Sequence, residues 1–98
     1  MSLRLVFRSV AQVEFDHAAR WYEDQRPGLG ADFVSEVQLV LDTIANHPAQ
    51  FPLADGDVRG AWVSRFPYCI YYRVKPDRAV IIAVFHTSRA PSLWKGRK

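Results

Sequence analysis

The chain has 98 residues, 49% of them hydrophobic, which is enough for one domain spanning residues 1–98 with a core of its own. Its single cysteine, Cys69, excludes an internal disulfide and a multi-cysteine zinc site, and no apolar run is long enough for a membrane span or a signal peptide, so we expect a cytoplasmic protein without a metal or other cofactor. The net charge of +3 is unevenly distributed, because residues 1–58 carry four arginines and nine acids (−5) whereas residues 59–98 carry nine basic residues and one acid (+8).

The first predicted element is a strand over residues 3–8, where apolar side chains alternate with arginine and valine. Ser9 followed by Gln12 predicts a capping-box start for a helix that continues to about Gln25. Apolar residues recur along it at roughly helical spacing: Val13, Ala18, Trp21 and Tyr22. A Pro-Gly pair then ends this helix.

A second helix is expected from about Leu29 to Asn46, because apolar residues form one clean stripe along it: Phe33, Val37, Val40, Leu41 and Ile44. The few residues between the two helices serve as a connector. Residues 47–57 contain two prolines and an Asp-Gly-Asp turn signal, and this composition predicts a loop.

Three strands are predicted in the second half, over residues 58–66, 68–74 and 79–86. Pro67 cannot donate a hydrogen bond to a neighbouring strand, so it marks a break or a bulge. Residues 75–78 (KPDR) predict a hairpin turn, and the last strand is apolar enough for a central position in the sheet.

The predicted element order is βααβββ. The fold class expected from it is α+β, with two helices packed on one face of a small, mostly antiparallel sheet. The other face of the sheet would then remain open, and it is the natural place for a functional surface.

Common catalytic patterns are missing from the sequence. The Gly-x-Gly at residues 26–33 follows a helix and has no third glycine, so it is a connector and not a phosphate loop. His17, His47 and His86 lack metal-type spacing, and Cys69 lies among strand residues where nothing would lower the pKa of its thiol. Hydrolase and oxidoreductase interpretations therefore find no support.

Four features together resemble the RelE/ParE superfamily of bacterial type II toxins, from Leu3 to Trp94. They are the element order, the connector RPGLGADF after WYEDQ, the segment VRGAWVSRFPYCIYYRV and the ending AVFHTSRAPSLW. The similarity is closer to the ParE-like branch, whose members are often labelled plasmid stabilisation proteins. The resemblance implies a growth-inhibiting toxin that is held silent by an antitoxin encoded by a neighbouring gene.

RelE-like members of the superfamily cut messenger RNA on the ribosome, and the resemblance implies a particular set of residues for them. They carry lysines before a tyrosine, an arginine just after it, and an arginine and a tyrosine near the C-terminus. Here Arg65 stands without a lysine, and Cys69 follows the tyrosine. Arg89 is the one match near the end, because Trp94 cannot exchange a proton as a tyrosine would.

His86 keeps the ribonuclease alternative open. An imidazole suits general acid–base chemistry, and Arg65, Arg73 and Arg89 would supply phosphate contacts around it. The competing interpretation is that His86 ends the last strand with a hydrogen bond to the backbone.

ParE-like toxins are taken to poison DNA gyrase, which requires a protein-binding surface in place of a catalytic set. Arg65, Arg73, Arg89 and Trp94 would suit a shared surface for the target or the antitoxin, because arginine and tryptophan dominate interface hot spots. Trp94 would equally suit a core position, and Trp62 is expected to be buried.

The charge asymmetry suggests an anionic partner for the basic half, either a nucleic acid or an acidic protein. Antitoxins of this superfamily bring a flexible, often acidic segment that folds over the toxin, so the antitoxin is the first candidate. Ordinary surface charge is the alternative, because a fold can bring the two halves together. A third functional interpretation is a degenerate, non-toxic module that only binds its antitoxin.

Overall fold

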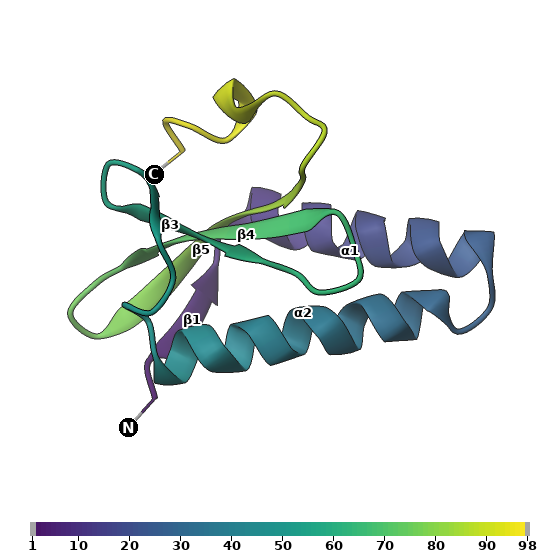
Figure 1. The fold of residues 1–98 in the computed structure, drawn as a ribbon, viewed down its shortest axis with the longest axis horizontal. Helices are drawn as coiled ribbons and strands as arrows, with labels where there is room; N and C mark the ends of the chain where they lie inside the picture. The colour runs from purple at the N-terminus through teal and green to yellow at the C-terminus, as the bar shows by residue number, and fades with distance from the viewer. Residues whose placement is uncertain (1, 98) are drawn as a thin grey trace.

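The computed structural model describes residues 2–97 and confirms the α+β class (Figure 1). Its helices and strands, in chain order, are β1 (Arg4–Phe7), α1 (Ser9–Gln25), α2 (Leu29–Asn46), β2 (Leu53–Asp55), β3 (Val58–Trp62), β4 (Tyr68–Val74) and β5 (Arg78–His86). A short 3₁₀ turn follows over Pro91–Leu93. Neither helix in residues 2–97 is long and apolar enough to cross a membrane.

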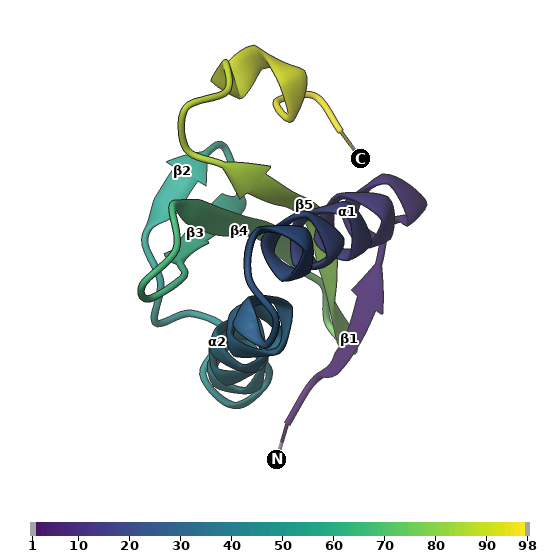
Figure 2. The same cartoon turned by 90° about the vertical axis from the view of Figure 1, so that its right-hand side faces the viewer.

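The five strands form one sheet in the order β1-β5-β4-β3-β2. β1 pairs in parallel with β5, and the other neighbours are antiparallel. Both helices pack on the same face of this sheet, as predicted (Figure 2). β5 is an interior strand and almost fully buried, which agrees with its continuous apolar sequence.

The loop predicted over residues 47–57 is wrong in one part, because β2 lies within it. β2 is only three residues long, and all three are exposed at the edge of the sheet. It pairs with β3 in an irregular register, Leu53 opposite Arg59 and Asp55 opposite Val58. Such a short, exposed strand carries no alternating pattern that could predict it.

The two helices begin and end at the predicted residues, but the predicted capping box is wrong. Ser9 is already helical, and the cap position is Arg8, which makes no side-chain capping bond. The side chain of Gln12 donates instead to Asp16, one turn further along the helix. The apolar pattern, and not the cap, therefore defines where α1 lies.

The connector between α1 and α2 is held by the carboxylate of Glu23. It accepts hydrogen bonds from the backbone N–H groups of Gly28 and Gly30 at 3.0–3.1 Å. Gly28 has a φ of +90°, and a Cβ at Gly30 would lie 2.6 Å from the carbonyl oxygen of Ala19. Both glycines are thus required by the geometry of this helical hairpin.

The main core lies between the helices and the sheet. Phe33 lies at the centre of this core. The centroid of its ring is 5.1–5.2 Å from the ring centroids of Tyr22, Phe66 and Tyr68. Tyr72 is fully buried, and its hydroxyl donates to the carbonyl of Pro48, which anchors the loop after α2. These aromatic contacts fix the helical hairpin against β4 and the turn that precedes it.

The other face of the sheet is not left open, contrary to expectation. The C-terminal segment crosses it on the side away from α2 (Figures 1 and 2). Trp94 is only 2% exposed there, stacked on Tyr71 with 3.8 Å between ring centroids. It forms a second apolar cluster with Val58, Val80, Ile82, Ala83 and Phe85.

The structure decides between the two environments expected for Trp94 and contradicts the one expected for Trp62. Trp94 belongs to the core, which excludes it from an exposed binding surface in this conformation. Trp62, expected to be buried, is 66% exposed. It ends β3 on the face that the C-terminal segment covers, but the segment passes over Tyr71 and leaves Trp62 in solvent.

Candidate functional site

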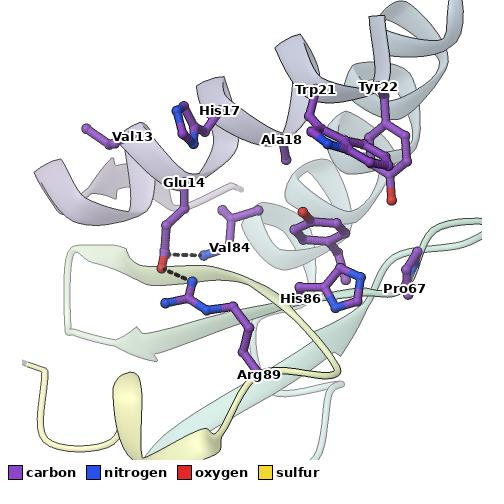
Figure 3. Close-up of a pocket in the computed structure, with 11 residues that line it drawn as sticks. Val13, Glu14, His17, Ala18, Trp21, Tyr22, Pro67, Val84, His86 and Arg89 are labelled. Atoms are coloured by element: carbon purple, nitrogen blue, oxygen red, sulfur yellow. Dashed lines mark hydrogen bonds and ion pairs between the residues drawn. The ribbon is translucent and has the colours of Figure 1, made fainter. Parts of the chain in front are cut away.

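A groove of about 550 Å³ runs between α1 and the ends of β4 and β5 (Figure 3). Its lining residues come from α1, from the start of β4 and from the end of β5 with the segment that follows: Val13, Glu14, His17, Ala18, Trp21, Tyr22, Pro67, Tyr68, Val84, His86 and Arg89. Most of this surface is contributed by apolar and aromatic side chains, with a few polar groups among them. That composition is typical of a binding site.

The wall formed by α1 is apolar and exposed. Ala11 and Ala18 point into the core and are buried, but Val13 is 62% exposed and Trp21 is 58% exposed. Val13, His17 and Trp21 follow one another at intervals of four residues, so they lie along one edge of the helix. An exposed apolar edge beside a groove is typical of a surface that binds another protein.

Glu14 lies at the base of the groove and is already saturated with hydrogen bonds. β1 pairs with β5 only as far as Ile81, and the N–H of Val84 donates instead to Glu14 at 3.1 Å. Arg97 donates to both carboxylate oxygens of Glu14 at 3.0 Å, and the Nη1 of Arg89 lies 3.5 Å from the Oε2 of Glu14. The remaining hydrogen-bonding capacity of the groove is therefore on its arginine, histidine and tyrosine side chains.

His86 lies at the end of β5 with its ring edge-on to Tyr68, 5.2 Å between centroids. The backbone N–H of Ser88 donates to its Nδ1 at 3.1 Å, and the Ser88 hydroxyl lies 2.7 Å from the same nitrogen. In the neutral ring the proton is then on Nε2. This backbone bond is the arrangement expected of a histidine that ends a strand.

Tyr68 and Tyr22 add phenol groups to the groove. Burial raises the pKa of both, and at Tyr68 the neighbouring Tyr22 raises it further. Both hydroxyls are therefore protonated hydrogen-bond donors at neutral pH. They can donate to a ligand, but they do not serve as bases there.

The arginines predicted as one surface pair with three separate acidic sites. Arg65 contacts Glu36 and Asp32 on α2, at 3.4 and 3.7 Å, and has a φ of +72°. Arg73 donates to Asp57 at 2.8 Å, and this bond lowers the pKa of that carboxyl group. Of the three, only Arg89 lines the groove, together with His86.

These ion pairs also bear on the charge asymmetry of the sequence. In each of them an arginine from the basic half meets a carboxylate from the acidic half. The fold thus mixes the two halves, as the alternative of ordinary surface charge requires. The basic half is less available to an anionic partner than its net charge of +8 suggests.

A family model described as the ParE toxin of a type II toxin–antitoxin system, parDE, matches residues 5–91. The match covers nearly the whole chain. The chain belongs to the ParE toxin family.

The ParE-like fold is also found in a solved structure titled "Chromosomal ParDE TA system from P. aeruginosa". The two chains superpose with a TM-score of 0.77 at 18% sequence identity, over 89% of this chain and 98% of the other. None of the curated proteins matches the sequence at a significant level. The protein is thus a toxin of a type II system by family, with the fold of a ParDE component.

Several groove residues of this ParE-family toxin were not predicted as site residues. The sequence places Val13 and Trp21 on the apolar side of the first helix, and the spacing of His17 does not indicate a metal ligand. A signal was available in the four-residue spacing of Val13, His17 and Trp21, which is offset from the buried Ala11 and Ala18. No group of three His, Cys, Asp or Glu within residues 2–97 is arranged to hold a metal ion.

Proposed function

We propose that this ParE-family toxin inhibits DNA gyrase in the cytoplasm and is neutralised by an antitoxin encoded next to its gene. Membership of the ParE toxin family is the observation that carries the proposal. The exposed apolar groove along α1 supports it, because a toxin that acts by binding protein needs such a surface.

Two features favour protein binding over cleavage of messenger RNA. Arg65, which the ribonuclease alternative needs beside His86, lies against the carboxylates of α2 and not in the groove. Trp94, where a proton-transferring tyrosine would serve, is buried against Tyr71 on the other face of the sheet. The observation that keeps the ribonuclease as a second candidate is that His86 and Arg89 share the groove.

The groove also suggests the chemistry of the antitoxin segment. Its walls, with Val13 and Trp21, require apolar side chains from the occupant. The Arg89 side chain is 46% exposed; its guanidinium group lies over the ring of Phe85, and its ion pair with Glu14 is long, at 3.5 Å, so it remains available to a carboxylate. We infer that the occupant is an amphipathic, acidic segment whose apolar side packs on α1 and whose carboxylate pairs with Arg89.

The direct test of the antitoxin is co-expression of the chain with each neighbouring reading frame, followed by affinity purification. We expect one short protein to be recovered with the chain at equal molar amount. Recovery of the chain alone with every neighbour would contradict the assignment of an antitoxin partner.

Replacing Arg89 by glutamine is expected to weaken antitoxin binding by about tenfold, the usual size of one charge-assisted hydrogen bond at an interface. The matched control is Arg73→Gln, because Arg73 pairs with Asp57 away from the groove. Isothermal titration calorimetry measures both affinities. Equal losses in the two variants would mean that only overall charge matters, and no loss at Arg89 would remove it from the binding surface.

A further inference from the structure

The C-terminal segment over residues 90–97, called the strap below, is joined to the rest of the protein by side chains. Every backbone–backbone hydrogen bond that it makes within residues 2–97 stays inside the strap. Its attachments to the sheet and α1 come from the side chains of Trp94 and Arg97. Segments without backbone bonds to their neighbours are those that open first in folded proteins.

The apolar attachment of the strap is the side chain of Trp94, whose ring is well packed but whose N–H group is not hydrogen-bonded. Its ring stacks on Tyr71, which itself packs over Gly60, where a Cβ would lie only 3.1 Å from the tyrosine ring. The buried indole Nε1 lies near the Tyr71 hydroxyl, but it makes no hydrogen bond of acceptable geometry within residues 2–97. A buried donor without an acceptor opposes closure, because the same N–H is hydrated when the strap is open.

Arg97 is the polar attachment. Its guanidinium group donates to both oxygens of Glu14 and to the carbonyl of Ile82, all at 3.0 Å. Gly96, with a φ of +89°, turns the chain back toward α1 just before it. Because Glu14 also lines the groove, the strap and the groove share one carboxylate.

The strap covers the second apolar cluster, and the one cysteine of the chain lies on the same face of the sheet. Cys69 lies on the same face of the sheet as Tyr71. A Cβ built at Gly60 would lie 3.3 Å from the sulfur of Cys69 and 3.1 Å from the ring of Tyr71. The Cys69 side chain is 2% exposed, and burial raises the pKa of its thiol to about 11. Its reaction with a thiol reagent therefore requires an opening of the structure.

We propose that residues 90–97 form a strap that opens as a unit while the helices and the sheet stay folded. Opening uncovers an apolar sheet face made of Tyr71, Val80, Ile82 and Phe85. Glu14 is the latch of this strap, so a change at the wall of the groove alters strap opening.

Native-state labelling of Cys69 with a disulfide reagent tests the strap. The labelling rate is measured at increasing urea below the unfolding transition and is compared with the rate of the fully unfolded chain at the same pH. We expect the free energy of opening obtained in this way to be smaller than the free energy of global unfolding from circular dichroism, and nearly independent of urea. Arg97→Gln and Glu14→Gln should each raise the labelling rate by about tenfold and lower the free energy of global unfolding by the matching amount, because only the closed state loses the contact; the difference between the two free energies should stay unchanged.

The control is Arg26→Gln, because Arg26 contacts Asp32 at the far end of the helical hairpin and should leave labelling unchanged. Trp94→Ala should raise the rate more than either latch variant does. The proposal is overturned if labelling has the free energy and the urea dependence of global unfolding, or if the latch variants and Trp94→Ala leave the rate unchanged. The second result would mean that Cys69 is reached by fraying elsewhere in the sheet.

Discussion

Replacing Trp21 by glutamate is expected to weaken antitoxin binding by about a hundredfold or more. Tryptophans at the centre of an interface commonly account for 2 kcal/mol or more of binding energy, roughly thirtyfold in affinity. The new carboxylate would in addition be desolvated beside an acidic partner, which adds repulsion. Because Trp21 is already exposed, the change should leave the fold intact. Calorimetric titration with the purified antitoxin measures the loss.

Trp62→Glu is the matched control for this experiment. Trp62 is exposed to a similar degree but lies on the opposite face of the sheet, away from the groove. We expect its affinity for the antitoxin to stay within about twofold of the unchanged protein, because a surface change outside an interface alters binding little. A large loss at Trp62 with none at Trp21 would place the antitoxin on the sheet face and not along α1.

Replacing Gly30 by alanine is expected to lower the free energy of unfolding by about 3 kcal/mol, the upper part of the usual range for overpacking. The added Cβ would lie 2.6 Å from the carbonyl oxygen of Ala19 and 2.9 Å from the side chain of Glu23. The two helices would have to separate, which would also weaken the bonds of Glu23 to the connector. Urea denaturation followed by circular dichroism gives the change.

The control for Gly30 is Gly56→Ala in the turn between β2 and β3. No atom lies within 4 Å of a Cβ at Gly56, so only its φ of +56° opposes alanine, at a cost of about 1 kcal/mol. In an uncrowded helix, by contrast, glycine to alanine stabilises by about 1 kcal/mol. A stabilised Gly30→Ala variant would therefore contradict the close approach of the helices.

The elements that the sequence predicts correctly are those with a strong local pattern. The apolar stripe from Phe33 to Ile44 predicts a helix with one buried face, and the apolar strands that follow predict a sheet. The helix and the sheet must bury their apolar faces against each other, which leaves few other folds for this sequence. β2 was missed because three exposed residues have no face to bury. The capping box predicted at Ser9 is wrong, because a serine followed by a glutamine three residues later does not by itself place the serine at the N-cap position.

The candidate site was harder to predict, because it depends on contacts between distant segments. The groove exists where β5 extends beyond β1, and Glu14 takes the place of the missing strand. The choice between a core and a surface position for Trp94, and the exposure of Trp62, both depend on the path of the C-terminal segment over Tyr71, which follows no local period. Pairing of the arginines likewise required the folded arrangement of both halves.

The central claim is that this ParE-family toxin acts on DNA gyrase, and a supercoiling reaction with purified gyrase tests it most directly. The antitoxin-free protein is added to the reaction, and its effect on a message in cell-free translation is followed beside it by primer extension. We predict that supercoiling is inhibited or that gyrase–DNA cleavage complexes accumulate, that the antitoxin restores activity, and that the message stays intact. Undisturbed supercoiling, together with codon-linked cuts in the message that vanish in His86→Ala, would contradict the account and make the protein a ribosome-dependent ribonuclease.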